Sequence, residues 1–495
     1  MPFSLATATL AVAAVFALKF LGTCVYNVFF HPLRRYPGPL LWRATRIPKQ
    51  LAWLTGDFGR RSDELHARYG AVVRIAPGEL SYINAQCWRD VFGRQPAGRR
   101  EMGKDTTFFG DPQAAAQNLV SAPYEDHARM RRLFSHAFSN SALVAQEPLL
   151  AQYANQMALK MGEVNRRDGR IDIVDFFNFT TFDIMAELAF GEPLGMLEKA
   201  DYVPWVRIIF DGLKYVVFRA VLLDVPVLGP LLNWLTASTL RAKAQEHFRF
   251  ASNLVDKRLS YTDHNKPDLW SFVLRHNEDG KGLTPSEMHA NASMFMVAGT
   301  ETTATNLSGV IYYLGRNPPV YRKLVDEIRA TFKTSDEITL GPLAEMEYLN
   351  AVVKEGLRIY VPGGGGLIRI VPPGGAEICG EYVPGGTSVT MNHYVAYRHP
   401  SNFSRPKEFI PERWLYPDDP RFASDKREVY EPFSYGPRNC IGKNLAQLEL
   451  RLLLAKTLWH YDIEVLPESK GWMSQKTYLT WEKGPLFVKL QPVER

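Results

Sequence analysis

The most restrictive feature of this sequence is the decapeptide Phe433–Gly442, in which Cys440 stands between two glycines and two residues after an arginine. The other cysteines lie far away, at spacings that suit neither a disulfide framework nor a metal cluster, which favours a reducing compartment. A lone cysteine is most often an inert buried side chain. Here, however, residues 444–458 predict a helix directly after the loop, and the positive end of a helix stabilises a thiolate. We therefore expect a loop that holds an anionic sulfur.

This decapeptide resembles, at every fixed position, the haem-thiolate signature F-x-x-G-x-R-x-C-x-G of the cytochrome P450 monooxygenases. In that family the cysteine thiolate is the axial ligand of the haem iron and favours cleavage of the O–O bond. The resemblance implies that Cys440 is the iron ligand of haem b. It also implies that Phe433, Gly436 and Gly442 hold the loop close to the macrocycle, and that Arg438 binds a haem propionate.

A long helix is predicted upstream, because capping signals at Thr284 and a stop at Gly315 enclose about thirty residues. Within it, Ala298–Thr303 matches the oxygen-binding pattern A/G-G-x-D/E-T-T/S of the same family. The resemblance implies that Thr302 and Glu301 relay protons, and a threonine can also bond the carbonyl four residues earlier. A glycine inside a helix costs about 1 kcal/mol relative to alanine. We therefore expect a ligand to pass close to the glycine of this segment.

Two short motifs resemble the structural network of the family. Glu355 and Arg358 form its E-x-x-R pair, and Arg413 lies in a P-E-R-W segment at the expected distance before the cysteine. The resemblance implies that these three side chains form a buried network, in which the loss of one member would strand a charge. Trp414 replaces the usual phenylalanine and is a small departure from the family pattern.

Three further basic residues are candidates for binding the haem propionates. His127 and Arg131 share one helix face at positions i and i+4 and resemble the W/H-x-x-x-R pair of the family. Arg369 follows a run of glycines. Guanidinium groups bind carboxylates well, so the three together suit the dianionic edge of haem. For each one alone, a solvated surface position is the favoured interpretation.

The remaining sequence indicates a mainly α fold with small β-sheets. Strand-like runs occur at 71–75 and 80–83, and a second sheet is expected near 368–391. A net charge of +6 without long runs of like charge gives nucleic-acid binding little support. The resemblance implies the cytochrome P450 fold, with one departure: four glycines occupy 363–366. We expect these glycines to leave an edge of the active site free of side chains.

The first thirty residues are long and apolar enough to cross a bilayer as a helix, with Lys19 as their single charge. A cleaved signal peptide is the alternative, but the first ten residues lack basic charge and no clear cleavage site follows. Arginines just downstream favour a cytosolic location for the rest. We therefore predict a membrane anchor at 1–30, a basic, proline-rich hinge at 31–50, and a haem-thiolate catalytic domain at 51–495. The resemblance places this single-pass anchor in the endoplasmic reticulum membrane.

The resemblance implies an NADPH- and O2-dependent monooxygenase that receives its electrons from a separate flavoprotein reductase. Segments 31–39 and 377–387 are similar to filamentous-fungal members of secondary metabolism, which implies a lipophilic polyketide, terpenoid or alkaloid-type substrate. A desaturase, a redox-neutral family member and a non-enzymatic membrane haem binder stay as alternatives. The expected wall of the substrate pocket is mostly apolar: Phe108, Phe109, Phe295, Ala298, Thr303, Leu367, Ile368, Leu479 and Thr480.

Overall fold

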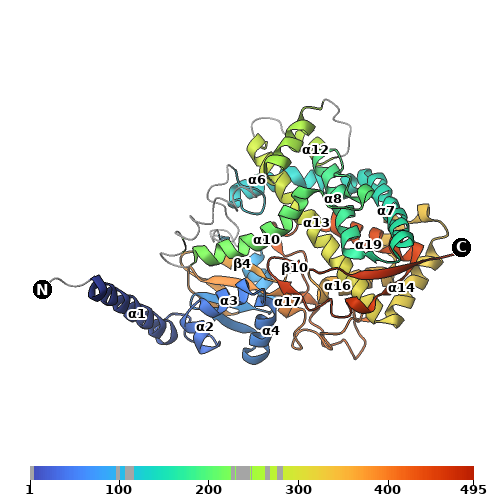
Figure 1. Ribbon diagram of the computed structural model, residues 1–495. Helices are drawn as coiled ribbons and strands as arrows, with labels where there is room; N and C mark the ends of the chain where they lie inside the picture. Colours follow the sequence, from blue (N-terminus) through green and yellow to red (C-terminus); the bar gives the residue numbers. More distant parts are fainter. Residues whose placement is uncertain are drawn as a thin grey trace.

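The computed structural model, which describes residues 5–95, 101–105, 116–224, 229, 246, 248–261, 268–275 and 282–494, is organised around one long helix, α13 (Pro285–Arg316) (Figure 1). The capping signals are confirmed. Thr284 accepts a hydrogen bond from the backbone N–H of Glu287, and the Glu287 side chain accepts one from the backbone N–H of Thr284. Most of the α13 side chains are buried, so the helix runs through the interior.

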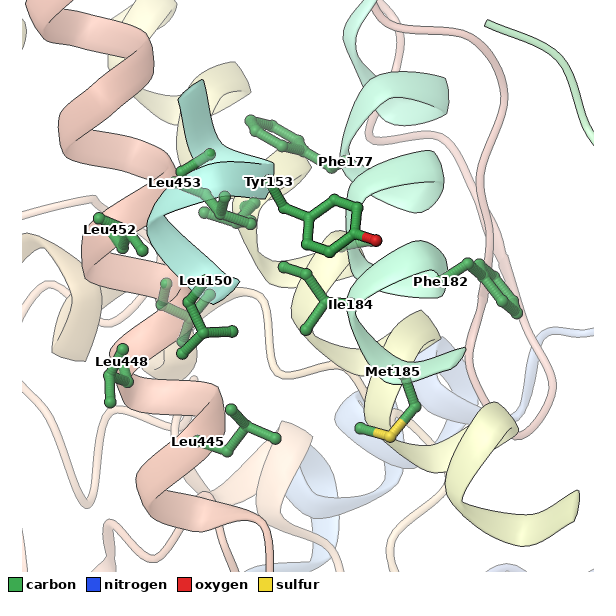
Figure 2. Close-up of a cluster of buried hydrophobic side chains, with 14 of the residues drawn as sticks. Leu150, Tyr153, Phe177, Phe182, Ile184, Met185, Leu445, Leu448, Leu452 and Leu453 are labelled. Carbon is green, nitrogen blue, oxygen red and sulfur yellow. The ribbon is translucent and has the colours of Figure 1, made fainter. Parts of the chain in front are cut away.

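Three helices, α7 (Asn140–Asp168), α8 (Ile173–Phe190) and α19 (Lys443–His460), form the largest apolar core with α13. The helix expected at 444–458 is therefore confirmed as α19. Its leucines occupy more than one side of the helix: in Figure 2, Leu445 points toward α8, whereas Leu448 and Leu452 lie on the opposite side. Each fully buried leucine contributes about 1.5–3 kcal/mol relative to an exposed one. The residues labelled in that view are Leu150, Tyr153, Phe177, Phe182, Ile184, Met185, Leu445, Leu448, Leu452 and Leu453.

The other helices surround this core or connect it to the sheets. They are α2 (Leu40–Ala44), α3 (Ile47–Leu54), α4 (Phe58–Tyr69), the π-helix η1 (Trp88–Phe92), α6 (Tyr124–Ala137), α9 (Met196–Lys199), α10 (Pro204–Leu223), α12 (Leu269–Arg275), α14 (Pro318–Thr331), α15 (Leu340–Glu345), α16 (Glu347–Ile359), α17 (His393–Ala396) and α18 (Glu412–Leu415). Among the described residues, helices predominate over four small sheets, which confirms the expected fold class.

The largest of these sheets has the strand order β1-β2-β7-β4. Its strands are β1 (Val72–Ala76), β2 (Glu79–Tyr82), β4 (Leu367–Ile370) and β7 (Ser388–Met391). The expectation of a separate second sheet near 368–391 is wrong for β4 and β7. β7 pairs in parallel with β2, and β4 pairs antiparallel with β7, so both halves of the chain join one sheet.

Three smaller sheets complete the described strands. β3 (Ile171–Asp172), β11 (Phe487–Pro492) and β8 (Tyr461–Val465) form one of them, with β11 in the middle. β5 (Ala376–Ile378) pairs with β6 (Glu381–Val383), and β9 (Lys476–Thr477) pairs with β10 (Trp481–Glu482). β9, β10 and the turn between them, together with Lys483, are called the C-terminal hairpin below.

Helix α1 (Leu5–Phe29) projects away from the rest of the molecule in Figure 1. Within the described residues it is the one helix long and apolar enough to cross a membrane, and its described side chains are largely exposed, except near its C-terminal end, where Asn27 and Val28 are buried. The segment after it is held against the body rather than free to swing as a hinge. Leu33 and Tyr36 are buried, and the backbone N–H of Arg74 donates to the carbonyl oxygen of Pro37 (2.7 Å).

The four glycines at 363–366 are packed rather than open, contrary to the expectation of a bare active-site edge. A Cβ on Gly364 would overlap the Thr477 side chain of the C-terminal hairpin. A Cβ on Gly365 would overlap the Trp53 ring of α3. The run therefore lacks side chains because neighbouring side chains fill the space beside it.

We predict that Gly364→Ala lowers the free energy of unfolding by about 1–3 kcal/mol, because the added methyl overpacks a filled site. Gly363→Ala is the matched control, since a Cβ there would meet only the His393 ring at 3.7 Å, an ordinary contact. Urea unfolding of the two variants measures the difference. Equal stability of both variants would contradict this account of the glycine run.

Candidate active site

The loop before α19 is shaped by its backbone and by its contact with η1. The backbone N–H of Cys440 donates to the carbonyl oxygen of Phe433 (2.8 Å), which closes the turn. Gly436 has a φ of 75°, and a Cβ there would overlap the carbonyl group of Phe92 at the end of η1. Glycine is therefore required at 436 by its left-handed backbone and by this close approach.

The sulfur of Cys440 is accessible to solvent, although protein surrounds it closely enough that burial raises the pKa of the thiol. Three groups oppose this shift and favour the thiolate: the backbone N–H of Gly442, the guanidinium of Arg131, and the ammonium of Lys443 at the first turn of α19. An accessible sulfur with cationic neighbours can serve as a metal ligand.

The predicted propionate-binding residues come together from separate elements. His127 and Arg131 lie on α6, Arg369 lies on β4, and Arg438 lies in the cysteine loop. Burial lowers the pKa of His127 to about 3, and the positive charges of Arg438, Lys104, Arg131 and Arg369 lower it further. Burial, followed by the charge of Arg438, lowers the pKa of Arg369 to about 10. These residues form a basic cluster that destabilises itself unless it binds an anion.

Lys104 belongs to the same basic cluster and was missed by the sequence analysis. Burial lowers the pKa of this lysine to about 7, and the charges of Arg369 and Arg438 add to the effect. The carboxylate of Glu101, 3.5 Å from Arg438, offsets part of the positive charge. No pattern around position 104 indicates a ligand, because its place in the cluster depends on the isolated β-bridge between Gly103 and Ile370.

The predicted oxygen-binding segment lies in the middle of α13, with one open face. Ala298 is exposed and Thr302 is partly exposed on this otherwise buried helix. The hydroxyl of Thr302 donates to the carbonyl oxygen of Ala298 (2.8 Å), the expected bond to the residue four positions earlier. A Cβ on Gly299 would overlap the terminal methyl group of Met185 on α8, which a movement of that flexible side chain can relieve. The expected ligand beside this glycine therefore stays a prediction.

Glu301 is buried, and its side chain bonds forward along α13 rather than toward Thr302. Its Oε1 accepts a hydrogen bond from the hydroxyl of Thr305 (3.3 Å) and forms an ion pair with Lys483 of the C-terminal hairpin. The hydrogen bonds of Glu301 and Thr302 therefore lead in opposite directions along the helix. A direct relay between the two groups needs a rotation of the Glu301 side chain.

Several predicted pocket residues are not placed as expected. Phe108 and Phe109 lie outside the described residues. Phe295 is buried against Phe134 and Phe138, with ring centroids 4.9 and 5.6 Å away, so it belongs to the core between α13 and α6. Thr303 is buried beside Glu449 of α19 and is not an open polar wall.

The other pocket candidates occupy positions that remain compatible with a wall. Leu367 and Ile368 lie on β4, next to Arg369 of the basic cluster. Leu479 and Thr480 form the turn of the C-terminal hairpin, where the backbone N–H of Tyr478 donates to the carbonyl oxygen of Thr480 (3.0 Å). All except Ile368 are partly exposed.

The predicted network of Glu355, Arg358 and Arg413 is present and fully buried. Glu355 accepts two hydrogen bonds from Arg358, each 2.8 Å long, and one of 3.3 Å from Arg413. The indole N–H of Trp414 donates to the same carboxylate (2.9 Å), which gives the unusual tryptophan a function that phenylalanine cannot supply. Asp425, which the sequence analysis missed, forms a buried ion pair with Arg413. Two carboxylates thus balance two guanidinium groups.

Comparison with known proteins agrees with this geometry. Residues 35–490 match the profile of the protein family described as Cytochrome P450. The chain belongs to the cytochrome P450 family. It is 43% identical to cytochrome P450 monooxygenase efuB of Hormonema carpetanum, over 95% of this chain and 94% of that protein. It is also 42% identical to astA of Talaromyces wortmannii, over 94% of each chain, and 41% identical to aclL of Aspergillus oryzae over the full length of both.

As a cytochrome P450, the protein is a haem-thiolate monooxygenase, and enzymes of this family use O2, a lipophilic substrate and a redox partner. The residues of this chain fit haem. The accessible Cys440 sulfur suits the iron, and the basic cluster suits two propionate carboxylates, whose charge would relieve the mutual repulsion. The nearest acceptor to Arg438 Nε among the described residues is the Glu101 carboxylate at 3.5 Å, a long ion pair, so this guanidinium keeps bonding capacity for an anion.

We predict that Asp425→Asn lowers the free energy of unfolding by about 3–5 kcal/mol, because it leaves Arg413 with an unbalanced charge in the interior. Asp419→Asn is the control, since Asp419 pairs with the exposed Arg421 at the surface. Chemical denaturation of the cytochrome P450 and both variants measures the effect. A loss in Asp425→Asn no larger than in the control would show that the network does not need its second carboxylate.

We predict that Glu449→Gln removes part of the pH dependence of stability. Burial raises the pKa of Glu449 to about 8 in the folded protein, from an ordinary value of 4.5. Between these pH values the folded state binds more protons than the unfolded state, so wild-type stability falls as pH rises. The loss between pH 5 and 7.5 amounts to about 3 kcal/mol. The free energy of unfolding is measured for both proteins at pH 5 and 7.5. Relative to wild type, Glu449→Gln should be more stable at the higher pH than at the lower pH. An unchanged difference would contradict the raised pKa.

Proposed function

We propose that this cytochrome P450 uses Cys440 as the axial ligand of haem b and receives electrons from NADPH through a separate flavoprotein reductase. The observation that carries the proposal is the accessible Cys440 sulfur, with Arg131 and Lys443 favouring its anionic form. When bound, haem supplies the activation of dioxygen. The division into an anchor at 1–30, a connecting segment at 31–50 and a catalytic domain at 51–495 is part of this proposal.

The cofactor is held by the loop and by the basic cluster. Phe433, Gly436 and Gly442 shape the backbone on the cysteine side of the macrocycle. The propionates bind to residues that arrive from four separate parts of the chain: Lys104, His127, Arg131, Arg369 and Arg438. Guanidinium groups bind planar carboxylates through two parallel hydrogen bonds, so these residues would hold the propionates of haem in a defined orientation.

Protons reach the oxygen side through α13. The Thr302 hydroxyl lies on the open face of the helix and holds a water or a proton there, next to the exposed Ala298. Glu301 supplies the proton after its side chain turns from Thr305 toward Thr302. The network of Glu355 and Arg358 on α16 and Arg413 on α18 supports the cysteine side of the site.

The substrate we propose is a lipophilic intermediate of fungal secondary metabolism, of polyketide, terpenoid or alkaloid type. The fungal sources of the similar monooxygenases support this class. Leu367 and Leu479 supply apolar surface, with Ile368 buried behind it, and Thr480 supplies a polar group, so binding depends mainly on buried apolar area. An ionised substrate would lose its hydration without a fixed counter-charge at this wall.

We also propose that α1 anchors the protein in the endoplasmic reticulum membrane, with the catalytic domain in the cytosol. The exposed apolar surface of α1 supports an anchor, and the arginines at 34, 35, 43 and 46 support a cytosolic body. A membrane anchor places the enzyme beside a lipophilic substrate dissolved in the bilayer.

We predict that Cys440→Ala abolishes the red-shifted carbon-monoxide band of the reduced protein, because no other residue of the loop offers an anionic sulfur. Cys24→Ala, on α1, is the matched control and should keep the band. Absorption spectra of the reduced proteins under carbon monoxide measure both results. A normal band in Cys440→Ala would overturn the haem-thiolate assignment of this cysteine.

We predict that neutral polycyclic aromatics and terpenoids shift the haem absorption spectrum, whereas small, highly charged metabolites do not. Apolar area that leaves water contributes about 25 cal/mol per Å², and the charged compounds gain little of it. Spectral titration of the reconstituted protein with both groups of compounds measures the preference. Shifts produced only by the charged group would exclude a lipophilic substrate.

A further inference from the structure

Glu301 lies in a buried ion pair whose partner comes from the far end of the chain. The side chains of Lys483 and Glu301 are only 5% and 3% exposed. Lys483 also donates to the hydroxyl oxygen of Thr305 (2.6 Å), and that hydroxyl donates to Glu301 Oε1 (3.3 Å). The three groups form a closed triangle around one carboxylate oxygen.

This triangle determines the direction of the carboxylate. Thr305 lies one helical turn after Glu301, whereas the Thr302 hydroxyl bonds back to Ala298. Glu301 Oε2 has no hydrogen-bond partner within the described part of the chain, although it is buried. One oxygen is therefore held by Lys483 and Thr305, and the other is left to take part in other bonds.

The C-terminal hairpin that carries Lys483 is held in place from its other side. Glu482 forms an ion pair with Lys214 of α10, and these side chains are 39% and 37% exposed. The ammonium of Lys214 also lies 5.8 Å from the ring centroid of Tyr478. Neighbouring hairpin residues thus face opposite environments: Glu482 faces a partly exposed contact with α10, and Lys483 faces the interior.

We propose that Lys483 is a positioning residue for Glu301, which keeps this carboxylate ionised and turned toward Thr305. The inference rests on the proposed function, in which Glu301 supplies protons. A buried carboxylate without a counter-ion takes up a proton, because its charge is poorly solvated. Lys483 therefore determines whether Glu301 is an ionised proton acceptor or a neutral acid. When Lys483 no longer binds Oε1, the Glu301 side chain can rotate toward Thr302.

Tyr360, at the end of α16, is the other titratable group that faces Glu301 among the described residues. Burial, followed by the nearby Glu301 carboxylate, raises the pKa of Tyr360 well above its ordinary value, so the phenol stays neutral. Its hydroxyl donates to the side-chain oxygen of Gln475 (2.6 Å). The ammonium of Lys483 is therefore the charge that balances Glu301.

Infrared spectroscopy of the haem-loaded, full-length protein tests the proposal. The difference between wild type and Glu301→Gln isolates the signal of Glu301, and we expect an ionised carboxylate at neutral pH. In the Lys483→Met background, the same difference should show a protonated carboxyl group. Lys483→Arg should restore the ionised signal, and Lys214→Met, which removes the partly exposed ion pair of the same hairpin, should leave it unchanged. An ionised Glu301 in Lys483→Met would overturn the proposal.

A second measurement separates positioning from a structural role. Peroxide released per NADPH consumed is measured from pH 6 to 9 in the reductase-reconstituted protein without added substrate. We expect the pH profile of Lys483→Met to differ from that of wild type, because its Glu301 is a neutral acid, and the profile of Lys483→Arg to follow wild type. Glu301→Gln gives the profile without any carboxyl group. A Lys483→Met profile that matches wild type would overturn the proposal.

A third comparison applies if the Lys483→Met variant does not fold. The double variant Glu301→Gln/Lys483→Met leaves no stranded charge, and its recovery of folded protein would support the pairing. Failure of the double variant as well would assign Lys483 a purely structural role and overturn the proposal. The carbon-monoxide band is recorded in each variant. Absence of the carbon-monoxide band from the wild-type protein would contradict the proposed function. If the band is present and Lys483→Met shows the same infrared signal of Glu301 as wild type, only this inference is contradicted.

Discussion

Buried charge that must be balanced is the constraint on which the rest of this structure depends. An unbalanced ion in the interior costs several kcal/mol, so each buried charged group needs a partner. The network around Glu355 is balanced within the protein, by two carboxylates and two guanidinium groups. Among the described residues, the basic cluster around Arg369 holds more positive than negative charge, and burial together with this charge lowers the pKa values of His127 and Arg369. The first arrangement stabilises the fold, and the second suits an anionic ligand.

The two arrangements differ in position as well as in charge. Arg358 and Arg413 also bond carbonyl oxygens of the segment between α17 and α18, so the network fastens that long loop to α16. The basic cluster, in contrast, gathers residues from α6, β4 and the cysteine loop around an accessible sulfur. The two sets of charges thus lie on different elements: the first fastens the loop before α18, and the second lies around the cysteine loop.

Close packing explains several glycines that a functional interpretation would assign to ligand binding. Gly365 accommodates Trp53 of α3, and Gly364 accommodates Thr477 of the C-terminal hairpin. In both places a missing side chain is compensated by a neighbour from a distant segment, as expected for interiors packed at high density. A glycine within a motif is therefore weak evidence for a ligand until the direction of its absent Cβ is known.

The local pattern of the sequence determined the features that depend on nearest neighbours along the chain. Capping residues placed the start of α13, apolar length indicated α1, and the spacing around Cys440 indicated the family and its chemistry. Tertiary structure alone decided which residues meet across the fold. Lys104 joined the basic cluster, Asp425 balanced Arg413, and Lys483 reached Glu301 from a position 182 residues later in the chain. Such pairings depend on how helices and strands assemble, and a linear pattern carries no record of contacts between segments so far apart.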